Sequence, residues 1–392
     1  MTLCSAALLL GLLSLSSTRA ATPPGRELLN QITEQTFAGD YDVAEHKLRE
    51  LGQQFPNHPA GDFYQASVLF WRINPDLSNA EYDARIILHL QQCIAKALPL
   101  ADVDTTRVDG LHYLGLCNTY LGRLEAQRGN LYAGGSRGEK GRDHLERAIA
   151  LCQTTNSVDP TCEDLYFPFG AYAYYAGRLP RFMQWMNFLW FVPRGSTEQG
   201  LMALERARTR STLHGLGATS LLANIYTLFE PGRSARGLEL SSQLIARFPD
   251  NPYLDVEHAN VLLASSHAAQ ALEHARQAVG KSAKGVRNYD APTALNAHLA
   301  EAEALLCLGR LDDAEGVLRG LRRDPRFDQL TGTPRIALLQ GMLADLRGER
   351  AKAILLYEEA RDHEGRTWNR QASKLARKYL EDPYRGQPQP AP

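Results

Sequence analysis

Apolar residues recur three or four positions apart along most of the chain, the spacing that gathers them on one face of an α-helix. Glycine, proline and polar clusters interrupt this spacing often, which predicts many short helices. Sustained alternation of apolar and polar residues is absent, so we expect almost no sheet. The pattern predicts about eight helix pairs, over residues 27–53, 60–97, 110–152, 164–208, 216–247, 253–279, 293–321 and 335–361, and a final helix near 367–380.

The clearest repeated unit runs from Arg335 to Arg361. Small residues stand where two antiparallel helices would touch, because backbones approach closely only where side chains are small. Gly348 is predicted to end the first helix, since glycine adopts the conformation of a helix terminus without strain. The positions that define the unit are Ala337, Gly341, Ala344, Gly348, Ala353, Tyr357 and Ala360.

Earlier segments carry the same arrangement. Small and large apolar residues fall at matching places over 302–321 and over 253–279. Two further segments close on a similar phrase, Phe55-Pro56-Asn57-His58-Pro59 and Phe248-Pro249-Asp250-Asn251-Pro252. A proline just past a helix cannot continue its hydrogen-bond ladder, so the shared phrase marks the end of one repeated unit.

These units resemble the tetratricopeptide repeat (TPR), most clearly over 253–361 and also over 27–59 and 216–252. The resemblance implies an all-α, right-handed superhelical solenoid of irregular helix pairs. The middle of the chain is similar to a group of exported bacterial TPR-like proteins, and a fainter likeness extends to eukaryotic proteins of TPR type. Neither group implies a defined biochemical activity. The segments that carry this second likeness are Phe169–Tyr175, Gly195–Leu201 and Leu204–Ala207.

TPR arrays bind through the concave surface lined by the first helix of each pair, so the resemblance implies a protein or peptide partner there. Asn260 matches one position of the clamp that grips a C-terminal carboxylate, but Val256 stands where that clamp has a basic residue. We therefore expect a folded surface or an extended peptide of another kind. In the alternative interpretation, aromatic residues here only fill gaps between helices. By the family pattern the candidate partner-binding residues are Tyr226, Phe229, Tyr253, Asn260, Arg335 and Asp345.

Residues 178–195 interrupt the repeats with an aromatic, apolar insert bracketed by Pro180 and Pro193. Prolines at both ends suit a short separate helix, which is too short to cross a bilayer. One interpretation packs this helix inside the solenoid. The other exposes it at Leu179–Val192, as the contact of a membrane-peripheral assembly or lipid-handling factor. The residues that would then bind a partner groove or a membrane interface are Phe182, Trp185, Phe188 and Trp190.

Residues 1–20 have the features of a signal peptide, with an apolar run at Ala6–Leu15 and small residues at Thr18 and Ala20 before the expected cleavage point. The run is too short to span a bilayer. No Lys or Arg precedes it, so the alternative is a buried N-terminal helix. Export would make this a periplasmic or secreted protein, with the cell envelope as its expected surroundings.

The cysteines that follow the signal peptide are relevant to export, because an oxidising compartment permits disulfides. Cys152 and Cys162 flank a polar loop between two predicted helices and are the best candidates for a bridge. The alternative is that all of these cysteines are buried as small hydrophobic residues. They are Cys93, Cys117, Cys152, Cys162 and Cys307.

Candidate chemistry is sparse. The segment Gly134–Gly141 is glycine-rich but lacks the Gly-Lys-Ser/Thr of a phosphate loop, and we interpret it as an inter-helix loop leading into a helix over 142–152. The 11 histidines show no metal-binding spacing, so we expect no catalytic residue, no cofactor and no metal. A formal net charge of -1, from 43 basic and 44 acidic residues, argues against a nucleic-acid partner.

The sequence as a whole predicts a non-enzymatic TPR protein–protein interaction scaffold in the bacterial periplasm or cell envelope. The expected organisation is a signal peptide (1–20), irregular N-terminal helix pairs (21–177), the aromatic insert (178–195), a C-terminal array with its capping helix (196–381) and a disordered tail (382–392).

Overall fold

The computed structural model of the chain describes residues 25–178, 195–230, 232–327, 333–361 and 370–386. Throughout these ranges every regular element is a helix. The helices are α1 (Arg26–Phe37), α2 (Tyr41–Gln54), α3 (Ala60–Ile73), α4 (Asp83–Asp102), α5 (Arg107–Gln127), α6 (Leu131–Thr154), α7 (Thr161–Asp164), α8 (Tyr166–Gly177), α10 (Thr197–Arg210), α11 (Gly215–Leu228), α12 (Ser234–Arg247), α13 (Pro252–Ala264), α14 (Ala268–Ala283), α15 (Ala291–Cys307), α16 (Leu311–Arg323), α17 (Thr333–Leu346), α18 (Arg350–Arg361) and α19 (Arg370–Glu381), with a 3-10 turn at Pro325–Phe327.

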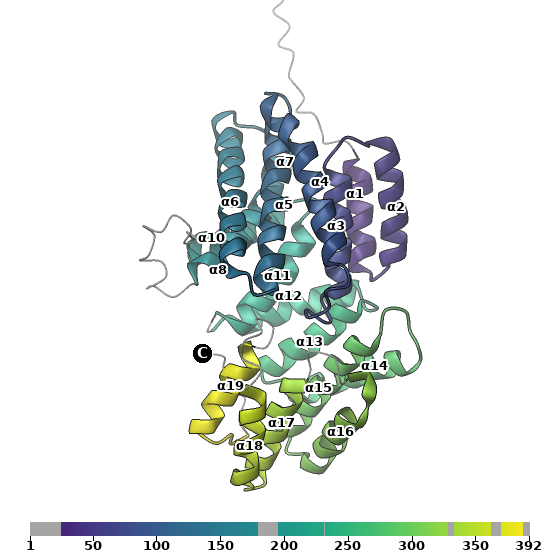
Figure 1. Cartoon of the computed structure of the whole chain (residues 1–392), viewed down its shortest axis with the longest axis vertical. Helices are drawn as coiled ribbons and strands as arrows, with labels where there is room; N and C mark the ends of the chain where they lie inside the picture. Colours follow the sequence, from purple (N-terminus) through teal and green to yellow (C-terminus); the bar gives the residue numbers. More distant parts are fainter. Residues whose placement is uncertain (1–24, 179–194, 231, 328–332, 362–369, 387–392) are drawn as a thin grey trace, which may run out of the picture.

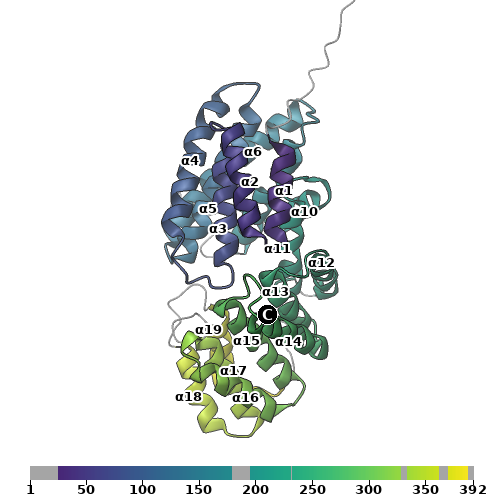
Figure 2. The same ribbon diagram turned by 90° about the vertical axis from the view of Figure 1, so that its right-hand side faces the viewer.

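Each of these helices packs against the next one along the described chain. The molecule is elongated, with α1 to α11 towards one end and α14 to α19 at the other (Figures 1 and 2). The helix bounds follow the predicted pairs closely, and the consecutive packing confirms an all-α, solenoid-like architecture.

The turn signals in the sequence act as predicted. Gly348 adopts a φ of 76° between α17 and α18, a backbone conformation that other residues reach only with strain. Phe55 and Phe248 end α2 and α12, and the phrases that follow them lead directly into α3 and α13. The Asn251 side chain caps α13 by accepting hydrogen bonds from the backbone N–H groups of Tyr253 and Leu254.

The prediction of a loop over Gly134–Gly141 is wrong, because these residues belong to the continuous helix α6. Glycine weakens an isolated helix, but here it lets α6 approach α5 closely. A Cβ atom added to Gly134 would lie 2.9 Å from the Gly122 carbonyl oxygen. One added to Gly141 would lie 2.9 Å from the Gly115 carbonyl oxygen. The glycines therefore form a backbone-to-backbone contact that any side chain would separate.

A second set of contacts joins alternate helices along the chain. We call these helices the inner row, and they are α1, α3, α5, α8, α11, α13, α15, α17 and α19. The row bends back on itself, since Trp71 of α3 packs edge-on against Tyr253 of α13 with 5.4 Å between ring centroids. Since α3 and α13 are far apart in sequence and meet through Trp71 and Tyr253, the inner row lies on the inside of the bend.

Side-chain contacts hold this bend closed. The Asn251 Nδ2 group donates to the Phe37 carbonyl oxygen at 2.9 Å, and Asn296 Nδ2 donates to the Pro75 carbonyl oxygen at 2.7 Å. The Phe37 ring packs between Trp71 and Phe248, at centroid distances of 4.7 and 5.7 Å. Carbonyls at the ends of inner helices are thus satisfied from the opposite side of the bend.

A buried polar cluster centred on Asp164 joins three distant segments. The fully buried carboxylate of Asp164 accepts hydrogen bonds from the Arg26 guanidinium, the Ser211 hydroxyl and the Leu213 backbone N–H. Arg26 also donates to the Thr212 hydroxyl at 2.7 Å. Against the opposing effect of burial, the neighbouring His214, Arg26 and His112 and the hydrogen bond from Ser211 lower the pKa of Asp164. The cluster therefore fixes the start of α1 to α7 and to the α10–α11 connection.

Acidification is expected to weaken the fold through His214, which lies beside this cluster. Burial lowers the pKa of His214 from 6.5 to about 3. Between these values the unfolded chain binds the proton and the folded chain does not, so stability is full above pH 6.5 and falls as the pH drops. The loss for this residue is about 2 kcal/mol near pH 5. Chemical unfolding of the wild type and of His214→Gln at pH 7 and pH 5 measures it. Between pH 7 and pH 5 the variant should lose less free energy of unfolding than the wild type. Equal losses would contradict the assignment of this pH dependence to His214.

Two disulfides lie in the N-terminal half. Cys152 and Cys162 form the predicted bridge between α6 and α7. Cys93 and Cys117 form a second one, between α4 and α5, which sequence spacing did not suggest. Cys307 is free and half-buried. The alternative of five unpaired buried cysteines is therefore wrong for four of them.

The predicted disorder from residue 382 does not extend to Tyr384. Its ring is buried and packs against Tyr379 at a centroid distance of 5.3 Å. Its backbone N–H donates to the Asp345 carboxylate at 2.9 Å. The polar, proline-rich composition of this segment concealed one aromatic anchor, which ties the end of α19 to α17.

Candidate functional site: the inner wall

Helix α13 is buried on most of its surface but keeps one partly exposed stripe. Tyr253, Glu257 and Asn260 are half-buried, whereas the residues between them are buried. Their spacing of four and three residues places the three side chains on one face of the helix. Since Trp71 meets Tyr253 from across the bend, this stripe faces the interior of the bend.

The neighbouring inner helices add polar and aromatic groups around this stripe. Asn224 of α11 is half-buried, Tyr175 at the end of α8 is 44% exposed, and Arg123 of α5 is exposed. The Arg123 guanidinium stacks over the Phe70 ring at 4.9 Å and donates to Asn74 Oδ1 at 3.0 Å. We call the surface formed by six residues of the inner row the inner wall; they are Trp71, Arg123, Tyr175, Asn224, Tyr253 and Glu257.

Electrostatic interactions show that these side chains share one space. Burial raises the pKa of the Tyr253 hydroxyl well above its ordinary value, and Glu257 adds to this rise while Arg123 opposes it. The surrounding protein desolvates the Tyr175 hydroxyl and raises its pKa, again opposed by Arg123, although part of the side chain is exposed. The phenols therefore stay protonated at any physiological pH and can donate hydrogen bonds.

Glu257 occupies the middle of the stripe. Burial raises the pKa of its carboxyl group, and Arg335 and the amides of Asn260 and Asn224 act in the opposite direction. Part of the side chain nevertheless remains accessible to solvent. Glu257 is thus largely surrounded by protein yet keeps some accessible surface.

Arg335 extends the polar surface onto α17. Its Nη2 atom donates to Glu303 Oε2 at 2.8 Å and to Asn260 Oδ1 at 3.3 Å. The charge of Arg335 is thus compensated mainly by Glu303 of α15, and three consecutive inner helices are linked by one guanidinium.

The inner wall combines large aromatic faces with donors and acceptors that keep part of their surface free. Amide and carboxylate groups can bind the backbone N–H and C=O groups of an extended chain, and aromatic rings provide apolar contact area with little loss of side-chain entropy. The arrangement lacks a nucleophile beside a base among the residues named here. It is suited to recognition.

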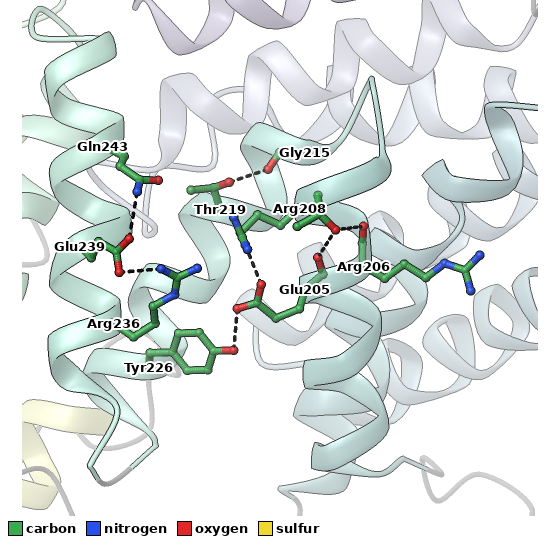
Figure 3. A network of polar contacts seen from close by, with 10 residues as sticks. Glu205, Arg206, Arg208, Gly215, Thr219, Tyr226, Arg236, Glu239 and Gln243 are labelled. Atoms are coloured by element: carbon green, nitrogen blue, oxygen red, sulfur yellow. Dashed lines mark hydrogen bonds and ion pairs between the residues drawn. The ribbon is translucent and has the colours of Figure 1, made fainter.

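Three of the residues predicted from the family pattern belong to this surface or border it, namely Tyr253, Asn260 and Arg335. Phe229 is half-buried next to it, with the Arg178 guanidinium 5.0 Å above its ring and the Tyr175 ring at 6.5 Å. Tyr226 is turned away into the fold, where its hydroxyl donates to Glu205 Oε1 at 2.9 Å (Figure 3).

Asp345 is also occupied within the fold. Its side chain is 1% exposed and accepts hydrogen bonds from the Tyr357 hydroxyl and the Tyr384 backbone N–H, besides pairing with Arg350. As placed, this carboxylate fastens α17 to α18 and to the C-terminal segment and offers no surface to a partner. The candidate residues of the insert, Phe182, Trp185, Phe188 and Trp190, lie outside the described residues.

Sequence reasoning missed Trp71, Arg123, Tyr175, Asn224 and Glu257. A signal existed only for Glu257, because Tyr253, Glu257 and Asn260 are spaced four and three residues apart and so share one face of the predicted helix. The others stand on helices whose mixed composition does not reveal which side turns inward.

Within the described part of the chain, no group of three or more His, Cys, Asp or Glu side chains is placed to hold a metal ion. None of the described helices combines the length and apolarity that a bilayer-crossing segment requires. No family model matches the sequence, and no curated protein matches it either.

Proposed function

We propose that this protein is a non-enzymatic interaction scaffold of TPR type, which binds an extended segment of another protein along the inner wall. The observation that carries the proposal is the half-exposed stripe of Tyr253, Glu257 and Asn260, faced by Tyr175 and Asn224 from neighbouring helices. Folded interiors seldom retain so many polar groups with accessible surface, and such surfaces are typical of protein recognition.

The pairing of inner and outer helices supports the TPR-type part of the proposal. Inner helices contact one another in sequence, and each of them before α19 is followed by at least one helix outside the row. A right-handed superhelix of such pairs presents its inner helices to a ligand. The closed bend between α3 and α13 gives this surface a fixed curvature, so less entropy is lost when a partner binds.

We place this function in an exported protein of the bacterial periplasm or cell envelope. Two disulfides in a chain of this size favour an oxidising compartment, and residues 1–20 carry the pattern of a signal peptide.

Site-specific photo-crosslinking tests the proposal. A benzophenone amino acid at position 175, where the native side chain is 44% exposed, should crosslink a discrete partner in the native envelope. The same probe at position 355 on the outer helix α18, where Leu355 is 68% exposed, is the matched control and should not. Crosslinks that form at 355 and not at 175 would remove the basis of the proposal.

Affinity of the captured partner is expected to depend on the inner wall. The double variant Tyr175→Ala/Asn224→Ala should weaken binding by about a hundredfold, because it removes an aromatic anchor and a hydrogen-bonding amide. Neither side chain is fully buried, so the circular-dichroism spectrum and the unfolding midpoint should stay close to wild type. Unchanged affinity in a folded double variant would place the contact elsewhere.

A further inference from the structure

Glu257 has an unusual electrostatic position within the inner wall. Among the described residues, no Lys, Arg or His side chain forms an ion pair with it. Arg335, the cation that lowers the pKa of Glu257, is already paired with Glu303 at 2.8 Å. A partly desolvated carboxylate without a counter-charge is costly, and an external cation would offset that cost.

The surroundings of Glu257 favour a cation over a neutral donor. Tyr253 stands one helical turn before it on the same face, and Trp71 packs edge-on against Tyr253. The Tyr175 side chain, 44% exposed, lies close enough to Tyr253 to contribute to the raised pKa of its hydroxyl. Aromatic faces attract ammonium and guanidinium groups, and a carboxylate beside such faces completes the recognition of a basic side chain.

Two flanking carboxamides complement this arrangement. Asn224 and Asn260 lie on either side of Glu257, from α11 and from the next turn of α13. Both amides lower the pKa of Glu257 by hydrogen bonding, and Asn260 Oδ1 also accepts from Arg335, so these neutral groups stabilise the carboxylate without supplying a counter-charge. Arg123, which also acts on Tyr253, forms no ion pair among the described residues and would repel a second basic group near its guanidinium.

We propose that Glu257, with Tyr253 one helical turn before it, selects a partner segment that carries one basic residue, Lys or Arg, at the position docked on α13. This inference rests on the proposed function, because it assigns the chemistry of the partner at the inner wall. Charge complementarity between the unpaired carboxylate and the basic side chain provides the specificity.

Selection of random dodecapeptides from a displayed library tests the inference. Purified wild type, Glu257→Gln, Glu257→Lys and Glu239→Gln are used as baits, the last as a matched control with an exposed glutamate on α12. Peptides selected by the wild type and by Glu239→Gln should share a basic residue at one position. They should bind Glu257→Gln about tenfold more weakly or worse. Glu257→Lys should select an acidic residue at that position.

The outcomes separate this inference from the proposed function. Peptides that bind the inner wall are recognised by their loss of binding to Tyr175→Ala/Asn224→Ala. If such peptides share no basic position, or bind Glu257→Gln as well as the wild type, this inference is overturned and the proposed function is not. A library from which no peptide depending on the inner wall is recovered would overturn the proposed function, and this inference with it.

Discussion

Replacing Asp164 with alanine is expected to lower the free energy of unfolding by about 4 kcal/mol, because breaking a buried ion pair leaves an uncompensated charge. The variant removes the acceptor of three hydrogen bonds at once, from Arg26, Ser211 and the Leu213 backbone N–H. Arg26 then remains nearly buried with only the Thr212 hydroxyl as a described partner. Equilibrium unfolding in urea, with the disulfides intact, measures the difference.

A solvent-exposed ion pair of similar reach provides the control for Asp164→Ala. Glu34 and Arg247 also join α1 to a distant helix, but their side chains are 41% and 56% exposed. Glu34→Ala should change the free energy of unfolding by less than about 1 kcal/mol, since solvent screens an exposed pair. Similar losses for both variants would show that Asp164 stabilises the fold no more than a surface carboxylate does.

The double variant Arg26→Met/Asp164→Leu separates the two parts of this effect. Replacing a buried ion pair by apolar residues of similar volume is often neutral or stabilising, so the double variant should be more stable than Asp164→Ala alone. If it is less stable, the hydrogen bonds around Asp164 matter more than the unpaired charge of Arg26.

The helices of this fold could be predicted because their signals are local. Apolar spacing set their ranges, and Gly348 and the phrase after Phe248 marked their ends through backbone conformations that depend only on neighbouring residues. The bridge between Cys152 and Cys162 could be predicted for the same reason, since a short loop brings the two cysteines together. Local pattern was sufficient wherever the determining contact was close in sequence.

Features that depend on distant contacts were missed. Gly134–Gly141 has the composition of a loop, and only the approach of α5 explains why it is helical. The pairing of Cys93 with Cys117 requires the relative rotation of two long helices. Tyr226 and Tyr175 both stand near the end of an apolar helix, yet one is hydrogen-bonded inside the fold and the other is exposed on the inner wall. Whether a residue faces the inside of a solenoid depends on the positions of the neighbouring helices, and the apolar periodicity of the sequence does not predict those positions.

Gly141→Val is expected to cost about 3 kcal/mol of stability, through the contact that local pattern failed to reveal. A Cβ atom at this position would lie 2.6 Å from the Thr119 hydroxyl oxygen and 3.1 Å from the Thr119 backbone nitrogen. Backbone atoms of α5 cannot rotate away as a flexible side chain could, so α6 must shift as a whole. The shift would also disturb the Gly122–Gly134 contact along the same interface.

A glycine on an open helix surface shows whether close approach is the cause. Gly316 of α16 has no atom within 4 Å of its added Cβ position. Gly316→Ala should therefore stabilise the protein by about 0.5–1 kcal/mol, because alanine favours the helix and nothing obstructs its methyl group. Thermal and urea unfolding of the two variants should shift in opposite directions. A Gly141→Val protein as stable as the wild type would mean that α5 and α6 can separate freely, and that the glycines of α6 are tolerated in the helix without being required by the packing.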